Sequence, residues 1–189
     1  MLKNIIPYAH DLLKNSIREG DTVVDATCGN GNDTVLLSNL VGESGHVYAV
    51  DVQQQAIEKT KERLEESKAK NVTCIHDSHA KLEQHLPEDL QGKIGGAVFN
   101  LGYLPRSDKQ IITKGDSTIT AVETLLTFLR KKALIVLVVY HGHEGGAEER
   151  DAVLSFVQSL DQKKYSVLKY QFLNQQNNPP FVLAIEKLV

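Results

Sequence analysis

Apolar positions along the chain switch repeatedly between two periodicities, and this switching predicts strands that alternate with helices. Residues 4–18 place apolar side chains at helical spacing, whereas Val23 and Val24 form the β-branched run of a strand buried on both faces. The last two apolar runs leave no room for a helix between them, so we expect them to pair antiparallel. The predicted helices span residues 4–18, 54–68, 79–86, 118–129 and 148–160, and a further helix follows the first strand and ends at about residue 40. The predicted strands span residues 22–26, 46–50, 72–75, 97–99, 133–140, 165–173 and 181–186.

This order of elements predicts an α/β, Rossmann-like fold: a mostly parallel seven-stranded sheet with a C-terminal antiparallel hairpin and helices on both faces. Right-handed crossovers place the helices there, and a ligand crevice is expected beyond the carboxyl ends of the parallel strands. Polar residues stand at five of these strand ends. They are Asp25, Asp51, the run from His76 to His79, Asn100 and the pair Tyr140 and His141.

The turn after the first strand contains Gly29 and Gly31, which permit a close approach of ligand to backbone. Asn32, Asp33 and Thr34 follow as candidate helix caps. A dinucleotide fingerprint requires a third glycine where Thr34 stands, and a Walker loop requires a lysine that is absent here.

The acidic end of the first strand instead favours S-adenosylmethionine (SAM), which has a sulfonium and an ammonium group and no phosphate. Asp25 would complement that cationic end. The alternative is an ordinary strand–turn–helix in which the glycines serve backbone geometry alone.

Other strand ends supply further candidate SAM contacts. Asp51 can accept hydrogen bonds from both ribose hydroxyls, as an acid does for a nucleotide ribose. Gln53 can cover the adenosine or simply open its helix, and His79 can bind the ligand or cap a helix. Asn30 and Asn32 can hold the amino-acid end of SAM or only satisfy the turn. The complete predicted set is Asp25, Gly29, Asn30, Gly31, Asn32, Asp51, Gln53, Asp77, Ser78 and His79.

The stretch Asn100-Leu101-Gly102-Tyr103 matches the position and spacing of the Asn-Pro-Pro-Tyr motif found in SAM-dependent amino methyltransferases. Asn100 would orient a neutral amine in line with the sulfonium, and Tyr103 would stack on a planar base. Leu101 and Gly102 would contact the substrate. The alternative is a tight strand-to-loop turn.

Residues 140–146 form a glycine-rich loop expected to cover the substrate, with Tyr140 and His143 as contacts. His141 could accept a proton from the acceptor or bind a phosphate or base. A metal site is the less favoured interpretation, since no cysteine cluster or HExxH helix accompanies the histidines.

The composition is that of a soluble globular domain: 189 residues, 41% hydrophobic and 24% charged, with a net charge of −3. No apolar run is long enough for a membrane span, and no signal-peptide pattern follows the N-terminus. Two cysteines make no disulfide framework, which favours a cytoplasmic location. We therefore expect a single domain over residues 1–189, and any nucleic-acid contact must use a local basic patch.

Four segments together resemble one bacterial family, the MnmM-type tRNA methyltransferases formerly labelled rRNA methylases. They are residues 25–34, 50–53, 99–105 and 140–146, and the similarity extends to Ala9, His10 and residues 174–180. The resemblance implies SAM-dependent N-methylation of 5-aminomethyl-uridine or its 2-thio form at the tRNA wobble position, with S-adenosylhomocysteine as the other product. It also implies a homodimer. SAM contacts implied by the family are Asn30, Asn32, Asp51, Gln53, Ser78 and His79.

Arg106 and Lys109 are the preferred contacts to tRNA phosphates because they follow the acceptor motif. The other candidates are Lys114 and Arg130, while Lys131 and Lys132 are expected on the surface at the opposite edge of the sheet. Two other functions stay open: methylation of rRNA or protein at the same site, and SAM or nucleotide binding without catalysis.

Overall fold

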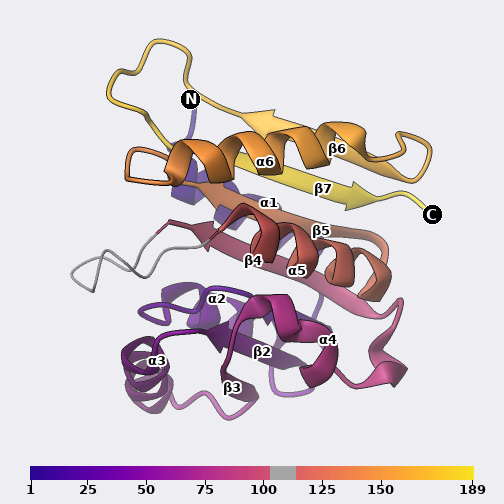
Figure 1. Cartoon of the computed structure of the whole chain (residues 1–189). Helices are drawn as coiled ribbons and strands as arrows, with labels where there is room; N and C mark the ends of the chain where they lie inside the picture. Colours follow the sequence, from indigo (N-terminus) through magenta and orange to yellow (C-terminus); the bar gives the residue numbers. More distant parts are fainter. Residues whose placement is uncertain (103–113) are drawn as a thin grey trace.

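The computed structural model describes residues 1–102 and 114–189, which form a seven-stranded sheet in the order β3-β2-β1-β4-β5-β7-β6 (Figure 1). The strands from β3 to β5 are parallel, and β7 pairs antiparallel with both β5 and β6. The predicted fold is therefore confirmed. The strands are β1 (Thr22–Asp25), β2 (His46–Asp51), β3 (Val72–His76), β4 (Ile94–Leu101), β5 (Leu129–Val139), β6 (Tyr165–Tyr170) and β7 (Phe181–Lys187); the helices are α1 (Ile5–Ser16), α2 (Asn32–Val41), α3 (Gln54–Glu66), η1 (His79–Lys81), α4 (Leu82–His85), η2 (Glu88–Leu90), α5 (Gly115–Phe128) and α6 (Gly146–Ser159).

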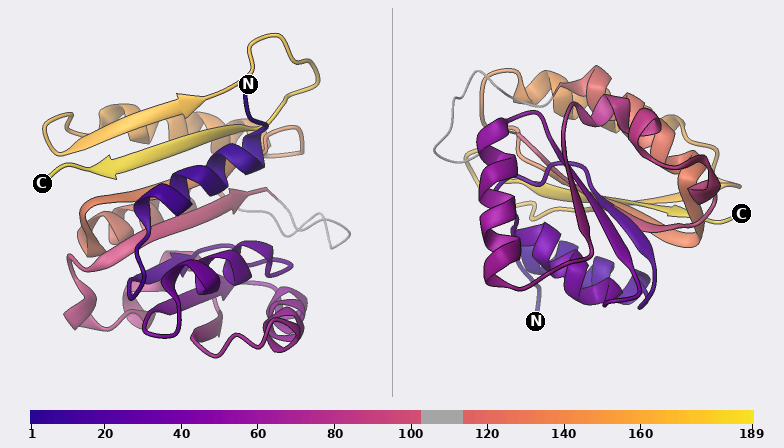
Figure 2. Two further views of the ribbon diagram at one scale, coloured as in Figure 1. Left: turned by 180° about the vertical axis from the view of Figure 1, so that it is seen from behind. Right: turned by 90° about the horizontal axis from the view of Figure 1, so that it is seen from below.

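Helices cover both faces of the sheet. Figure 2 shows α1 and α2 on one face and α5 and α6 on the other. Alternating side chains of β5 explain the two layers: Val136 packs in one core with Leu13 of α1, and Leu137 packs in the other with Leu125 of α5. From Ala133 to Val139 this strand is apolar and mostly buried, with side chains on both faces of the sheet.

Strand register brings the polar strand ends to one edge of the sheet. Asp25 pairs with Ala49 of β2 and Val98 of β4, so the loops after β1, β2 and β4 leave the sheet at neighbouring points. The strand order reverses between β1 and β4, which is where a ligand binds in an open α/β sheet.

Two strands begin earlier than the apolar pattern predicts. In β4, Gly95 and Gly96 precede the predicted start, and a Cβ on Gly95 would lie 2.3 Å from Asp21 Oδ2. In β5 most of the added residues are polar, and Arg130 donates to Asp21 Oδ2 at 2.9 Å. Glycine is thus required for close packing beside Asp21 rather than for a turn.

The predicted capping of α2 is wrong. Its N-cap is Gly31 in the left-handed conformation, without a side-chain cap bond, and α2 begins at Asn32. The polar side chains of its first turn bind partners elsewhere: Thr34 bonds to Asp25, and Asp33 bonds to His10. None of the helices in the described ranges is long and apolar enough to cross a membrane.

Candidate active site

The loop after β1 is held in a compact shape by α3. Gly29 and Gly31 have φ values of +53° and +79°. A Cβ on Gly31 would lie 3.0 Å from Thr60 Cα, so only glycine fits there without a shift of α3. Thr60 Oγ1 donates to the Gly29 carbonyl at 3.3 Å, and Arg63 Nε donates to the Asn30 carbonyl at 2.8 Å.

Asp51 joins this loop to the end of β2. Its Oδ2 accepts the Gly29 N–H at 3.0 Å, and its Oδ1 accepts the Gln53 N–H at 3.0 Å. Burial raises the pKa of Asp51, and these hydrogen bonds oppose that shift. An ionised carboxylate has about four acceptor positions, so Asp51 retains capacity for further donors. The structure places Asn30 and Gln53, both half-buried, and the exposed Asn32 around the same loop.

The expectation that Asp25 faces a cationic ligand is not met. Its side chain is completely buried and uses both oxygens inside the protein: Thr34 Oγ1 donates to Oδ2 at 2.7 Å and the Thr27 N–H to Oδ1 at 3.2 Å. Burial, with the nearby Asp33, raises the pKa of Asp25 to about 8. A carboxyl that is largely protonated at neutral pH and shielded by protein atoms fixes the loop rather than neutralising a ligand.

Asp77 is also committed to protein contacts, and its predicted ligand contact is not supported. Its carboxylate pairs with Lys81 at 2.9 Å and with His85 at 3.0 Å, and it accepts the Ser78 N–H. The bond to Lys81 and that to His85 hold the pKa of Asp77 below its usual range. Ser78 Oγ accepts the Ala80 N–H and caps η1. Both side chains therefore shape the turn that presents His79.

His79 is the strand-end residue whose surroundings best suit a ligand. Only 7% of the residue is exposed, and its Nδ1 donates to the Ala26 carbonyl at 3.1 Å. Its Nε2 is buried without a hydrogen-bond partner among residues 1–102 and 114–189. Burial lowers the pKa of His79, so the neutral ring presents Nε2 as an acceptor. A buried acceptor of this kind normally has a donor, here one that a ligand can supply.

Asn100 lies at the end of β4, in a chain of polar contacts with two residues whose site role the sequence analysis missed. Its side-chain Nδ2 donates to Asp33 Oδ2, and Asp33 Oδ1 accepts from His10 Nε2 at 2.7 Å. The Asn100 backbone N–H also donates to Thr27 Oγ1 at 2.6 Å. The only available sequence signals were the position of Asp33 after the glycine loop and the family similarity at His10.

The contact between Asn100 and Asp33 fixes the side-chain amide. Because Nδ2 is donated to a carboxylate, the carbonyl Oδ1 of Asn100 is the group left to accept a hydrogen bond. This is the orientation that the acceptor motif requires for binding an amine N–H. Asp33 is therefore a positioning residue in this arrangement.

Tyr140 and Gly102 lie side by side at the ends of β5 and β4. The Tyr140 N–H donates to the Leu101 carbonyl at 3.1 Å, and a Cβ on Gly102 would lie 3.4 Å from Tyr140 Cβ and 3.6 Å from His143 Cε1. The structure thus brings together three predicted substrate contacts. Another of the predicted contacts, Leu101, is wrong as a side-chain contact because it is completely buried in the core.

The prediction that His141 acts in catalysis is not supported, because both ring nitrogens are engaged within the protein. Nε2 donates to the Pro179 carbonyl at 3.0 Å, and Nδ1 accepts from Arg150 Nη1 at 3.3 Å. Its ring also packs against Phe181, with centroids 5.7 Å apart. His141 therefore fastens the loop after β5 to the segment that precedes β7.

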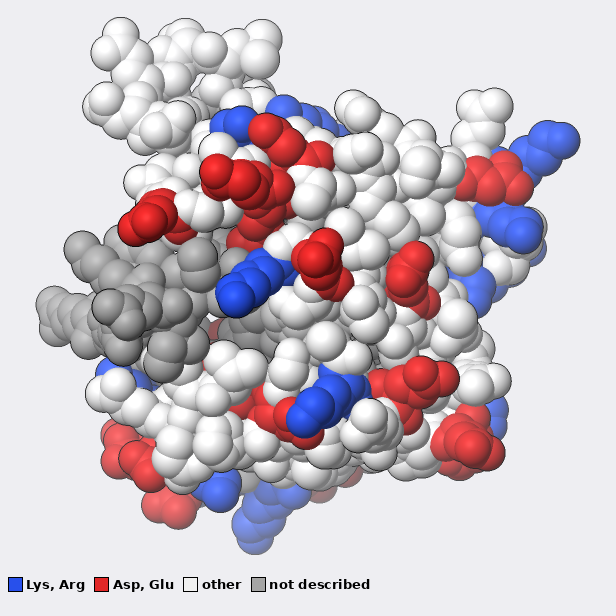
Figure 3. All heavy atoms as spheres, in the orientation of Figure 1, with Lys and Arg blue, Asp and Glu red and all other residues white. Residues whose placement is uncertain are grey.

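The basic candidates divide into three groups. Arg106 and Lys109, like Tyr103, lie outside the described residues. Arg130 donates to the Ser16 carbonyl and Asp21, which leaves it poorly placed for phosphate. Lys131 and Lys132 are exposed where β5 begins, as predicted, and Lys114 is exposed before α5. Acidic and basic side chains are interspersed on the face seen in Figure 3.

One observation fits a bound SAM: the buried Nε2 of His79 has no hydrogen-bond partner within the described residues. Asp51 and its neighbours would hold the ribose and Asn30 and Asn32 the amino-acid end. Within the described parts of the chain, no three His, Cys, Asp or Glu side chains are grouped so that they could hold a metal ion.

Comparison with known proteins finds that the chain is similar to methyltransferases. The chain is 39% identical to the chloroplastic tRNA (mnm(5)s(2)U34)-methyltransferase of Arabidopsis thaliana, over 98% of this chain and 70% of the relative. A putative methyltransferase of Streptococcus mutans, SMU.1697c, solved in complex with SAH, is 44% identical over all of both chains, with a TM-score of 0.90.

Another solved structure matches this chain over its full length. A putative rRNA methylase of Clostridium thermocellum is 41% identical over all of both chains, with a TM-score of 0.95. Residues 47–186 match the family model described as "Putative rRNA methylase". Together with the fold, these matches show that this chain belongs to that family of SAM-dependent methyltransferases.

Proposed function

We propose that this protein transfers the methyl group of SAM to the primary amine of 5-aminomethyl-uridine, or of its 2-thio form, at the wobble position of tRNA. The product is the 5-methylaminomethyl nucleoside. The substrate follows from the name of the Arabidopsis relative, which matches 98% of this chain. The chemistry follows from the site, because Asn100 presents a carbonyl oxygen beside the loop after β1, to which we assign SAM binding.

The orientation of Asn100 is the observation on which the proposal depends. Oδ1 would accept an N–H of the amine and direct the nitrogen lone pair toward the methyl carbon. The amine must first be neutral, although an alkyl amine such as lysine has a pKa of about 10.4 in water. Burial beside a sulfonium disfavours the ammonium form, and the released proton passes to solvent.

In the transfer itself, bound SAM supplies a methyl group activated by its positive sulfur. The transfer would break one S–C bond and form one N–C bond, so the positive charge would pass from sulfur to nitrogen. The products would be the neutral thioether S-adenosylhomocysteine and a methylammonium group, which can release a proton to solvent. We assign SAM binding to Asn30, Asn32, Asp51, Gln53, Ser78 and His79. We assign Gly102, Tyr140 and His143 to the substrate, Tyr103 to stacking on the uracil, and Arg106 to phosphate.

The decisive experiment is mass spectrometry of tRNA nucleosides from a deletion strain. The methylaminomethyl nucleoside should disappear and its aminomethyl precursor accumulate. The gene for the native protein should restore the product, and the Asn100→Ala gene should not. An unchanged nucleoside profile would refute the proposal, and methyl transfer from labelled SAM to rRNA or protein instead would identify the other acceptor.

We further propose that each protomer is a single domain and that two protomers form a homodimer. The protein would act in the cytoplasm, where tRNA is modified. The edge strand β6 supports an association surface, since Val167 and Leu168 are 39% and 44% exposed. Light scattering of the purified protein tests this directly: a mass of about twice 21.0 kDa is expected, and a monomer at micromolar concentration would contradict it.

A further inference from the structure

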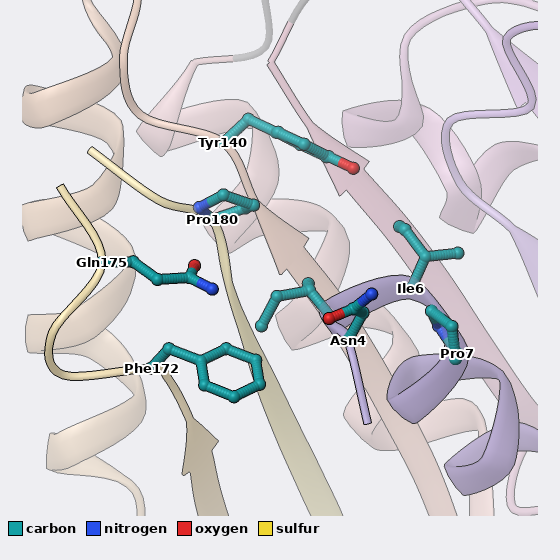
Figure 4. A pocket seen from close by; sticks show the side chains of 8 residues that line it. Asn4, Ile6, Pro7, Tyr140, Phe172, Gln175 and Pro180 are labelled. Carbon is teal, nitrogen blue, oxygen red and sulfur yellow. The ribbon is translucent and has the colours of Figure 1, made fainter. Parts of the chain in front are cut away.

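A cavity of about 270 Å³ opens beside the acceptor site, between the start of α1 and the segment that joins β6 to β7. Figure 4 shows Asn4 and Ile6 on one side, Phe172 and Gln175 on the other, and Tyr140 across the end nearest the sheet edge. Asn100, Asp33 and Gly102 do not line it. Tyr140 is the link, because its backbone bonds to Leu101, the neighbour of Asn100. The cavity is therefore adjacent to the reaction centre and distinct from it.

The walls of this cavity are fixed by an aromatic cluster outside it. Tyr170 stacks on Tyr8 of α1 with ring centroids 3.9 Å apart, and its hydroxyl donates to the Lys3 carbonyl at 2.7 Å. Phe172 packs edge-on against Tyr170 at 5.7 Å. These contacts join α1 to the end of β6, so the cavity exists before any ligand binds.

The residues that line the cavity suit a neutral, planar ligand. Among the described residues that line it, none is Lys, Arg, Asp or Glu. These residues would therefore give a phosphate or an ammonium group no countercharge for the hydration that it loses. Tyr140 and Phe172 offer ring surfaces, and Asn4 and Gln175 offer amides with both donors and acceptors. Asn4 makes no side-chain cap bond to α1, although it occupies the N-cap position. Its amide is thus available to a ligand.

We propose that this cavity binds one unstacked nucleobase of the RNA, adjacent in sequence to the nucleotide that bears the amine. Proteins that read single-stranded RNA loops stack bases on aromatic side chains and bind their edges by hydrogen bonds. The volume suits one base, since whole ligands fill pockets of about 300–1,000 Å³. The inference rests on the proposed function for the identity of the RNA. Holding the neighbouring base splays the loop and directs the acceptor base past Tyr140 toward Asn100.

The test is a binding cycle that combines protein variants with abasic RNA. Anticodon stem-loops carry an abasic nucleotide at the acceptor position, at its 5′ neighbour or at its 3′ neighbour, and affinity is measured by fluorescence anisotropy. The protein variants are Gln175→Ala, Asn4→Ala and Phe172→Leu. Gln176→Ala is the matched control, because Gln176 is exposed and does not line the cavity. Titration with SAM checks that each variant is folded.

For the wild-type protein, removing one neighbouring base should weaken binding roughly tenfold, as expected for the loss of one stacked base. The Phe172→Leu and Gln175→Ala variants should lose most of that sensitivity, whereas Gln176→Ala should keep it. The proposal would be overturned if the losses of affinity caused by the protein variants simply added to those caused by the abasic nucleotide, at the 5′ neighbour and at the 3′ neighbour alike. Coupling only to the abasic acceptor position would also overturn it, by placing the acceptor base in the cavity. Methylation of the intact loop is measured separately and tests the proposed function alone.

Discussion

The contact of Asp33 with Asn100 gives a quantitative prediction for catalysis. In Asp33→Ala, Asn100 Nδ2 loses its acceptor, and the amide is free to rotate and present N–H groups to the amine. A hydrogen bond to a charged group contributes about 1.5–3 kcal/mol, and each 1.4 kcal/mol corresponds to about a tenfold change in rate. We therefore expect single-turnover methylation to slow by roughly 10- to 150-fold at saturating SAM and RNA.

The slowing of single-turnover methylation should depend on how much of the hydrogen bonding to Asn100 each substitution leaves in place. Asp33→Asn keeps one carbonyl acceptor and should slow the reaction less than Asp33→Ala. His10→Ala leaves the Asp33–Asn100 bond in place and removes only the 2.7 Å contact to Asp33, which should cost about 1 kcal/mol, or fivefold. SAM affinity, measured by calorimetry, should change little in all three variants.

Asp11→Ala is the matched control, since Asp11 lies on the same helix as His10 and pairs only with the exposed Lys3 among the contacts described. The reasoning would be refuted if Asp33→Ala slowed single-turnover methylation no more than Asp11→Ala. It would also fail if the whole loss appeared in SAM affinity, because Asp33 would then support the SAM loop rather than Asn100.

Three further predictions concern the loops. Gly31→Ala should lower the free energy of unfolding by about 2–3 kcal/mol and weaken SAM binding, because strain at positive φ and a clash with α3 act together. Gly92 is the control, since its φ is +70° and no atom lies within 4 Å of a Cβ there, so Gly92→Ala should cost only the strain, about 1–2 kcal/mol. If both variants lost the same free energy in denaturant unfolding, the clash with α3 would be contradicted. The pKa of Asp25 is raised from 3.8 to about 8, so the stability that protonated Asp25 gives the fold is fully present below pH 3.8 and is lost as pH rises through 8. Asp25→Asn should flatten that decline of stability in thermal melts from about pH 4 to 9. An unchanged slope would show that Asp25 ionises freely. His141→Ala should lower the melting temperature by several degrees, since a domain of this size loses about 2–4 °C per kcal/mol. The single-turnover rate should nevertheless stay within about threefold of the wild-type rate. A loss of rate as large as that of Asn100→Ala across pH would restore His141 as a base.

The sequence was sufficient to predict that the polar strand ends gather at one edge of the sheet, because strand ends and glycine turns are local signals. Strand β4 was predicted too short since Gly95 and Gly96 resemble a turn, although they serve the packing of a strand against Asp21. The start of β5 was missed for a related reason: Arg130 is polar and yet sits in a strand through its bond to Asp21. Tertiary contacts outweigh local propensity at both places.

The roles of individual site residues were harder to predict than their positions. Asp25 and His141 stand at the correct edge, but whether their polar atoms face a ligand depends on distant partners such as Thr34 and Pro179. The contact between His10 and Asp33 joins residues that are 23 positions apart. No periodicity or spacing in the chain encodes such a pairing.

The position of β7 has a consequence for synthesis on the ribosome. This strand follows every other strand in sequence, yet it lies inside the sheet between β5 and β6. Until residues 181–187 have left the exit tunnel, the apolar edge of β5 from Leu134 to Val139 has no strand to pair with. An open apolar edge is a template for aggregation. We therefore expect nascent chains of this protein to need protection by a chaperone until synthesis has passed β7, and slow translation near that point to lower the yield of folded protein.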